Sequence, residues 1–365
     1  MAAFNRLTLR SLSATAVTVP MKRPLGTSAQ TIDSASMLLL DLETDEGVRG
    51  HAYAFCYLPS IARALVPIVA ELSNVLAGQA LVPVELAQRI GRHFKLPGVV
   101  GPLAMVASSV DTAAWDALAV SAGMPLAAFL GAEARPIPAY NSNGLGLMSP
   151  QAAADEALAL LDGGFRAVKL RLGRADFEHD LAAVHAVRRC LPDGIRVMVD
   201  FNQALSFAEA MQYCPGLDGE GVYWIEEPIR HDDYQHLSLV AQATRTPIQI
   251  GENFAGLAPM AAALAAGASD HVMLDLDRIG GVTGWQRAAG LAAAYNREVS
   301  SHLFPEVSVH LLAATPGRHW LEYVDWAVPL LQEPLEVVDG MAIVPNRPGN
   351  GMRWNEEVVA RFRLE

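Results

Sequence analysis

Three short segments decide the fold of this 365-residue chain: VMVDFN (197–202), YWIEEP (223–228) and IQIGEN (248–253). Each begins with apolar, strand-type residues and ends with an acid that turn-forming residues follow. Asp200, Glu226 and Glu252 are evenly spaced, since 226 − 200 and 252 − 226 both equal 26. One strand and one helix fill such an interval, so the segments predict successive βα units with an acid at each strand end.

The same alternation continues on both sides of these segments. Eight runs are expected as strands: 137–140, 167–172, 196–201, 221–226, 248–252, 271–276, 299–303 and 320–323. Ala-rich helices are expected between them, among others at 151–161, 180–190, 257–266 and 283–295. Eight units of this kind predict the α/β class and a (β/α)8 TIM barrel. A doubly wound open sheet is the alternative, although it seldom has so many regular units.

The segments outside the repeat differ in character. Residues 36–42 and 51–57 are expected as strands joined by a turn, and helical periodicity follows in 60–76, 83–92 and 103–122. We therefore expect an α+β capping domain over 1–130 and a modified barrel with the active site over 131–328. The tail, 329–365, is expected to return to the capping domain.

Charge and composition narrow the function. The chain has 39 acidic and 27 basic residues and a formal net charge of −12, which argues against binding to nucleic acid or to an anionic membrane surface. No uncharged apolar run reaches the roughly 18 residues of a membrane span. Its three scattered cysteines form no disulfide framework. We expect a cytoplasmic protein that acts on a small molecule.

Active sites of such barrels lie where the strands end. Asp200, Glu226 and Glu252 would converge there and repel one another unless a cation neutralised them. Oxygen ligands of this kind favour Mg²⁺, one per subunit, with Mn²⁺ as a substitute. The structural alternative, that each acid is a solvated loop residue or a helix cap, fits one acid better than three in the same phase.

The neighbouring strands supply groups of other kinds. Lys169 and Arg171 are two residues apart and point to one face of their strand. Asp275 and His302 end adjacent strands and could form a pair in which the acid orients the imidazole. Asp277 is the rival partner of this histidine.

Six motifs together resemble the enolase superfamily, and the mandelate racemase subgroup matches best. They are Asp200-Phe-Asn-Gln, Trp224-Ile-Glu-Glu-Pro, Gly251-Glu-Asn, Ile279-Gly-Gly-Val-Thr-Gly-Trp, Ser300-Ser-His-Leu-Phe and His319-Trp-Leu-Glu. The resemblance covers essentially the whole chain, including the Ala113-Ala-Trp-Asp-Ala-Leu segment and the tail.

This resemblance implies roles for named residues. Asp200, Glu226 and Glu252 match the Mg²⁺ ligands, with Glu227 a neighbour only. His302 and Asp275 match the catalytic pair, and Lys169 the first lysine of a Lys-x-Lys motif. Glu322 matches an acid, expected to be protonated, that donates to the substrate carboxylate. The expected substrate contacts are Ser142, Asn202, Phe55, Tyr57, Ala29 and Leu303, the last four surrounding an aromatic ring.

Arg171 departs from the family pattern, because the subgroup has a lysine there as the second base. A guanidinium rarely gives up a proton, so racemisation by two bases is in question. We expect racemisation or epimerisation of a 2-hydroxy acid with an apolar or aromatic substituent, through an ene-diolate. The alternatives are a dehydratase of acid sugars, with His302 as base and acid, and a metal-binding protein without either activity. A homo-oligomer is expected from the relatives.

Overall fold

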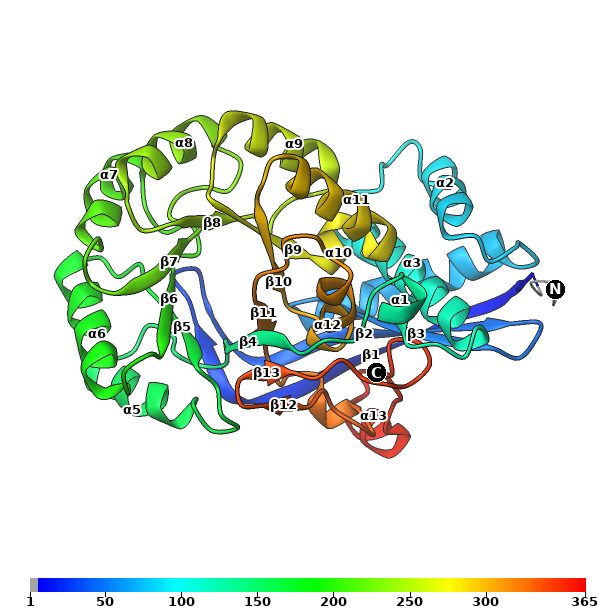
Figure 1. The fold of residues 1–365 in the computed structure, drawn as a ribbon. Coiled ribbons are helices and arrows are strands. Elements are labelled where there is room, and N and C mark those ends of the chain that lie inside the picture. Colours follow the sequence, from blue (N-terminus) through cyan, green and yellow to red (C-terminus); the bar gives the residue numbers. More distant parts are fainter. Residues whose placement is uncertain (1–5) are drawn as a thin grey trace.

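The computed structural model describes residues 6–365, and its N-terminal part is a three-stranded antiparallel sheet (Figure 1). The strands are β1 (Leu9–Gly26), β2 (Thr31–Thr44) and β3 (Arg49–Phe55), with β2 in the middle. The run of leucines in β2 is explained by burial on both faces, since Leu38 and Leu40 pack in one hydrophobic cluster and Leu39 in another. The long β1 precedes the expected strand at 36–42, and the N-terminal sequence up to Pro20 alternates as a strand does.

Helices cover one face of this sheet. They are α1 (Pro59–Leu76), α2 (Pro83–His93) and α3 (Pro102–Ser121); the short α4 (Leu126–Phe129) follows them and packs against α3. By length and composition alone, α1 and α3 are apolar enough to cross a membrane. Each contains two charged residues, and α3 is largely buried between the sheet and the barrel. Burial in a protein core explains the apolar composition of α3.

The rest of the chain is built on a curled parallel sheet. Its strands are β4 (Ile137–Asn141), β5 (Ala167–Arg171), β6 (Arg196–Asp200), β7 (Val222–Glu226), β8 (Ile248–Ile250), β9 (His271–Asp275), β10 (Glu298–His302) and β11 (Leu321–Tyr323). β4 to β10 pair in sequence order, and β11 pairs with β4. Across the seam between β10 and β11, Ser301 N–H donates to Trp320 O at 3.0 Å and His319 N–H to Val299 O at 2.8 Å. The α/β class and the TIM-barrel fold expected from the sequence are confirmed.

Helices follow the strands around the outside of the barrel (Figure 1). They are α5 (Pro150–Ala159), α6 (Phe177–Cys190), α7 (Phe207–Gly216), α8 (Tyr234–Ala243), α9 (Leu257–Ala266), α10 (Leu276–Ile279), α11 (Gly281–Ala294) and α12 (Pro305–Ala313). Only the 3₁₀ turn η1 (Val328–Leu330) stands where the eighth helix would follow β11. The barrel is therefore a modified one.

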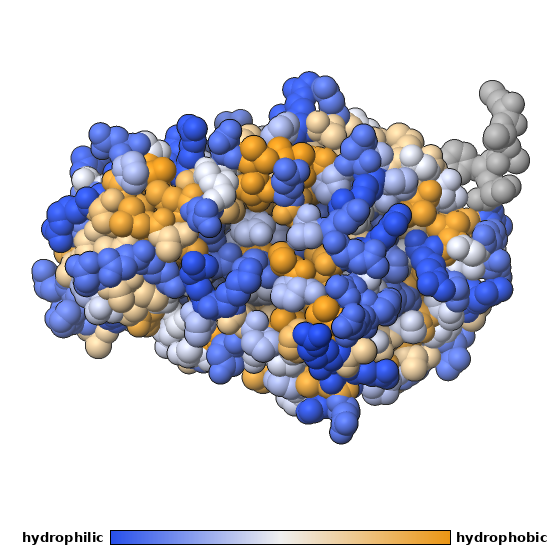
Figure 2. Space-filling model, turned by 90° about the horizontal axis from the view of Figure 1, so that it is seen from below, coloured by the Kyte–Doolittle hydropathy of each residue, from blue (hydrophilic) through white to orange (hydrophobic). Residues whose placement is uncertain are grey.

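The C-terminal tail contacts both parts of the molecule. It contains β12 (Val337–Val338), β13 (Met341–Ala342) and α13 (Glu356–Phe362). β13 pairs with the barrel strand β4, whereas Leu364 N–H donates to Ala16 O in β1 at 2.8 Å. The face in Figure 2 carries hydrophobic residues in several groups separated by hydrophilic ones.

Buried polar contacts fix the N-terminal part against the carboxyl ends of the barrel strands. The Asp277 side chain accepts from Phe55 N–H at 3.2 Å, and the main-chain carbonyl of Asp277 accepts from the Ser108 hydroxyl at 2.6 Å. Tyr53 donates to Glu306 at 2.8 Å. The β1–β2 turn reaches the loop after β6, where the Ser28 hydroxyl lies 3.3 Å from Phe201 O. These contacts bring β3 and this turn to the rim of the barrel.

Candidate active site

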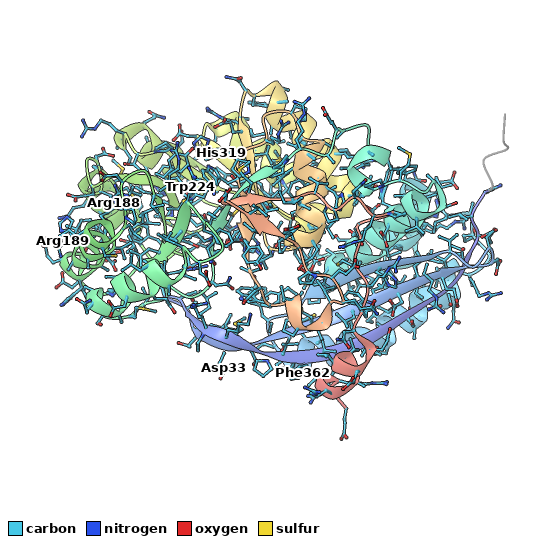
Figure 3. The ribbon with its side chains drawn as sticks, turned by 60° about the horizontal axis from the view of Figure 1, so that its bottom comes forward. Asp33, Arg188, Arg189, Trp224, His319 and Phe362 are labelled. Carbon is cyan, nitrogen blue, oxygen red and sulfur yellow. The ribbon has the colours of Figure 1, made fainter. Side chains whose placement is uncertain are left out.

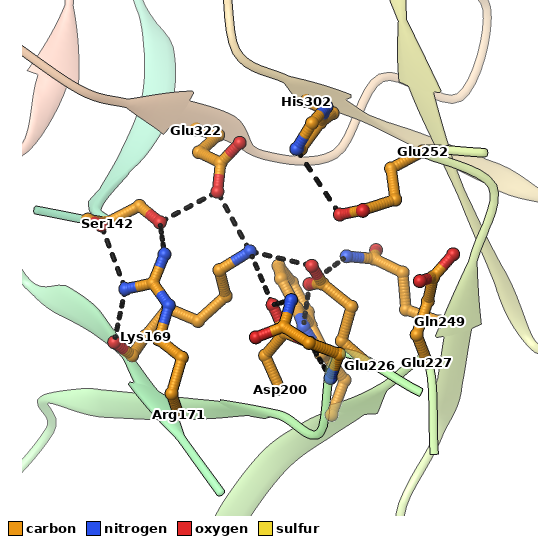
Figure 4. Close-up of polar contacts among 12 residues, drawn as sticks. Ser142, Lys169, Arg171, Asp200, Glu226, Glu227, Gln249, Glu252, His302 and Glu322 are labelled. Carbon is orange, nitrogen blue, oxygen red and sulfur yellow. Dashed lines mark hydrogen bonds and ion pairs between the residues drawn. The ribbon is translucent and has the colours of Figure 1, made fainter. Parts of the chain in front are cut away.

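Polar side chains from the barrel strands gather at one rim, and Figure 4 shows most of them. Lys169 and Arg171 lie in β5, Asp200 ends β6, Glu226 ends β7, Asp275 ends β9, His302 ends β10 and Glu322 lies in β11. Ser142 follows β4, and Glu252 stands two residues after β8. All of these residues except Glu252 are buried. Below them, Tyr140, Met198, Trp224 and Met273 fill the barrel interior.

Two overlapping groups of three carboxylates meet at this rim, and the second group surrounds the ammonium of Lys169. Asp200, Glu226 and Glu252 each offer an oxygen, and these atoms lie within 4.8 Å of one another. Lys169 Nζ lies 3.2 Å from Asp200, 2.6 Å from Glu226 and 2.8 Å from Glu322. Glu226 also accepts from Trp224 and Gln249 at 3.1 and 3.3 Å. Burial raises the pKa of Glu226 to about 8, with Lys169 opposing this and Asp200 adding to it. Excess negative charge of this kind suits a hard divalent cation.

Glu227 points away from this cluster. Its backbone has a positive φ of 37°, and its carboxylate accepts from Asn253 Nδ2 at 2.8 and 2.9 Å. The structure therefore separates adjacent acids: Glu226 faces Lys169, and Glu227 faces the β8–α9 loop.

His302 and Asp275 form a buried pair. His302 Nδ1 lies 2.6 Å from Asp275 Oδ2, and Nε2 lies 3.3 Å from Glu252 Oε2. Burial opposes protonation of the ring, but Glu252 and Asp275 outweigh it and raise the pKa of His302 to about 9. Asp277 does not contact the ring, because it accepts from Phe55 instead. The geometry brings Asp275, not its rival, to the histidine.

Glu322 is a hydrogen-bond acceptor here, which differs from the expectation of a protonated donor. Its carboxylate accepts from Ser142 at 2.7 Å, from Lys169 at 2.8 Å and from Leu303 N–H at 2.9 Å. Burial alone would raise its pKa, but Lys169 and His302 lower the pKa of Glu322 below its ordinary value. Leu303 has a φ of 52°, so a strained turn aims its N–H at this carboxylate.

Arg171 is tied to backbone and hydroxyl oxygens. Its NH1 donates to Ser142 O and Gly144 O, both at 2.9 Å, and its NH2 donates to Ser142 Oγ at 2.8 Å. Its Nε is buried without a partner. The guanidinium is thus fixed at the wall of the site rather than free to swing.

A cavity of about 230 Å³ opens above these groups. Of the predicted contact residues, Ala29, Tyr57, Asn202 and Leu303 line it. Phe55 lies behind Tyr57, with ring centroids 4.5 Å apart, and does not line the cavity. Ser142 does not line it either, because its hydroxyl is engaged with Glu322 and Arg171.

Several lining residues were missed by the sequence analysis. They are Leu25, Thr27, Gln30, Ile32, Gln203, Asn253, Arg278 and Trp326. Arg278 NH1 donates to Asn253 Oδ1 at 2.6 Å and to Glu252 O at 2.9 Å, so it braces the β8–α9 loop. The position of Arg278 directly after the Asp275-Leu-Asp segment is the sequence signal that could have identified it as a residue of the site. The β1–β2 turn residues carry no such signal, since only the fold brings them to the rim.

Gly251 shapes the turn that presents Glu252. Its φ is 132°, and a Cβ there would collide with the Met273 carbonyl oxygen. Only glycine fits such a turn without strain.

Comparison with known proteins agrees with this geometry. Residues 10–131 match the N-terminal domain of mandelate racemase / muconate lactonizing enzymes, and residues 152–358 match the enolase C-terminal domain-like family. The chain is therefore a Mg²⁺-dependent enzyme of the enolase superfamily. Within that superfamily it belongs to the mandelate racemase / muconate lactonizing enzyme family.

Three relatives illustrate the range of the family. An enolase from alpha proteobacterium BAL199 with bound magnesium is 44% identical, with a TM-score of 0.95 over 98% of this chain and 100% of that one. A Bradyrhizobium enolase complexed with magnesium and mandelic acid is 40% identical, with a TM-score of 0.94 over 99% of each chain. The L-talarate/galactarate dehydratase of Salmonella typhimurium is 33% identical over 71% of this chain and 66% of its own length. Other relatives are cycloisomerases and an epimerase.

Proposed function

We propose that this enzyme removes the α-proton of a 2-hydroxy carboxylate with His302 as the base. His302 lines the cavity, and its Nδ1 donates to Asp275. This bond fixes the ring, and Nε2, which lies 3.3 Å from Glu252 Oε2, is the nitrogen that would take the substrate proton. A positioned base of this kind contributes about 10²–10⁴-fold to the rate.

We propose Asp200, Glu226 and Glu252 as the Mg²⁺ ligands. When bound, the ion would place its positive charge beside the substrate carboxylate. This would stabilise the negative charge that develops there by several kcal/mol. Lys169 adds a second positive charge to the same oxygens, and Glu322 holds this lysine in place at 2.8 Å. The proposed division of labour is a barrel (131–328) that performs the chemistry and a capping part (1–130 with 329–365) that closes the site.

The anchored guanidinium of Arg171 favours a one-base reaction, and dehydration of a sugar acid fits best. The α-proton passes to His302 Nε2, giving an ene-diolate. The β-carbon–oxygen bond then breaks, and the same Nε2–H protonates the departing hydroxyl, which leaves as water. The remaining enol becomes a 2-keto acid. No proton donor is required on the opposite face, where Arg171 is held by Ser142 and Gly144.

Racemisation is the second candidate, and the cavity wall favours it. Leu25, Ile32, Tyr57, Leu303 and Trp326 form an apolar side that suits an aromatic substituent. The Bradyrhizobium relative is complexed with mandelic acid, a 2-hydroxy acid with an aromatic substituent. Thr27, Gln30, Asn202 and Gln203 line the same cavity and could pair with the hydroxyls of a sugar acid.

One experiment separates the two reactions. The Mg²⁺-loaded enzyme is incubated in deuterium oxide with a library of sugar acids and with both mandelate enantiomers. We expect 2-keto products from at least one sugar acid and none with His302→Asn. Inversion of mandelate without any keto product would establish the racemase instead. Exchange that survives His302→Asn would refute the role of this histidine.

A further inference from the structure

A second cluster of metal-ligand side chains lies at the opposite end of the barrel. His271 begins β9, Glu298 begins β10, and these two residues are register partners in the sheet. His319 precedes β11, and its N–H donates to Val299 O at 2.8 Å. The active site lies at the carboxyl ends of the same strands, so this cluster is separate from it. In Figure 3, His319 lies beside Trp224 of β7.

The distances suit a small four-coordinate ion. Glu298 Oε2 lies 3.5 Å from His271 Nδ1 and 3.8 Å from His319 Nε2, and the two imidazole centroids are 4.6 Å apart. One ligand atom from each residue lies within 4.8 Å of the others. Bonds of about 2.0–2.1 Å in a tetrahedral site place ligand atoms about 3.4 Å apart. A small side-chain adjustment would close the cluster around an ion.

Of the two ring nitrogens at the cluster, one has no hydrogen-bond partner and the other is paired with a tyrosine. His271 Nδ1 is buried without a hydrogen-bond partner. His319 Nδ1 lies 3.3 Å from Ser300 Oγ, an outer hydrogen bond typical of a metal-binding histidine. Its Nε2 lies 2.8 Å from the Tyr223 hydroxyl, so on metal binding Tyr223 would move aside or become the fourth ligand.

The protonation of the two histidines and the charges around them also affect whether the cluster binds a cation. Burial lowers the pKa of His271, and burial, His271 and Arg196 lower that of His319 to about 3. Asp270 and Glu298 attract a cation to this region, whereas Arg297 and Arg196 repel it. Arg196 itself is stacked on the Tyr223 ring, 4.2 Å from its centroid.

We propose that His271, Glu298 and His319 bind one Zn²⁺ ion. Two imidazoles and one carboxylate form a ligand set that zinc prefers over magnesium. The ion would join β9, β10 and the segment before β11, across the seam where β10 meets β11. Its effect is expected on stability, because a ligand that binds only the folded chain raises the unfolding temperature.

Zinc binding to the full-length protein tests this proposal. Calorimetric titration with Zn²⁺ in excess Mg²⁺ should show one site, with a higher unfolding temperature. His271→Ala and Glu298→Gln should each weaken binding by about 100-fold or more, since even outer-shell partners contribute 10–100-fold. Glu298 is largely exposed, so its variant should fold normally.

Two controls distinguish this site from others. His185→Ala alters a surface His–Glu pair, 2.6 Å from Glu220, and should bind Zn²⁺ as the unaltered protein does. Glu252→Gln alters the rim cluster and should also retain the site. The proposal is overturned if the unaltered protein binds no zinc, if His271→Ala binds it normally, or if Glu252→Gln abolishes it. Co²⁺ gives an independent check, since four-coordinate Co²⁺ absorbs strongly in visible light and His271→Ala should lose that absorption.

Discussion

Arg171 binds both the main chain and the side chain of Ser142: one guanidinium nitrogen donates to the carbonyl oxygen at 2.9 Å and another to the hydroxyl at 2.8 Å. The Ser142 hydroxyl in turn donates to Glu322 at 2.7 Å. A side chain held in this way acts as a fixed positive charge. It connects β5 to the carboxylate that positions Lys169.

Arg171→Lys should therefore change the stereochemistry more than the extent of exchange. An ammonium can lose a proton, which provides a second base on the opposite face. We expect inversion of a 2-hydroxy acid to appear, with slower one-base turnover because Ser142 and Gly144 lose their donors. Chiral chromatography of the deuterated product measures both effects. Arg171→Met is the matched control, and inversion there would show that this position supplies no base.

Asp275→Asn should lower the exchange rate by about 10²–10⁴-fold, because the amide no longer holds His302 Nδ1–H in the productive orientation. Asp277→Asn serves as the control. Asp277 is buried and accepts from Phe55 N–H, a bond that an asparagine oxygen also accepts. Its variant should keep the exchange rate within a few-fold. Equal losses in the two variants would contradict the assignment of Asp275.

Glu226→Gln and Glu227→Gln remove adjacent charges with different expected results. The first should weaken Mg²⁺ binding by about 100-fold or more, since a ligand contributes at least as much as an outer-shell partner. The second removes a partner of Asn253 and should affect Mg²⁺ binding less. Calorimetric titration with Mg²⁺ gives both affinities, and unfolding curves check that each variant folds. Similar affinities in both would refute Glu226 as a ligand.

His310 predicts a loss of stability in mild acid. Its buried Nδ1 accepts from Ala127 N–H at 3.2 Å, and burial lowers the pKa of His310 from 6.5 to about 4. The unfolded chain then binds more protons than the folded one between these values. Stability is full above pH 6.5 and falls as the pH drops toward 4, by about 3 kcal/mol.

Urea unfolding between pH 7.5 and 4 tests this prediction. His310→Gln should be less stable at pH 7.5 but should show a shallower decline with falling pH. Parallel pH profiles for the two proteins would show that His310 does not titrate in this range.

Much of the barrel and its rim could be predicted because their signals are local. A strand end and the acid after it are adjacent in sequence, so Asp200, Glu226 and Glu252 could be placed before the fold was known. The orientation of Glu322 could not be predicted, since three donors from β4, β5 and the loop after β10 determine it. The β1–β2 turn is a further example, because its position at the rim depends on packing between segments about 170 residues apart, as in the bond from Ser28 to Phe201.

The position of the β1–β2 turn means that the cavity lining and the proposed proton chemistry lie partly in different segments of the chain, which can change separately in evolution. Thr27, Ala29 and Gln30 line the cavity from a connection between two strands of the N-terminal sheet, whereas the proposed proton chemistry lies on barrel strands. Loops tolerate substitution better than strand ends that hold buried charges. Selection can therefore alter which substrate is accepted by changing this turn, while the strand-end residues proposed to break the carbon–hydrogen bond are inherited intact.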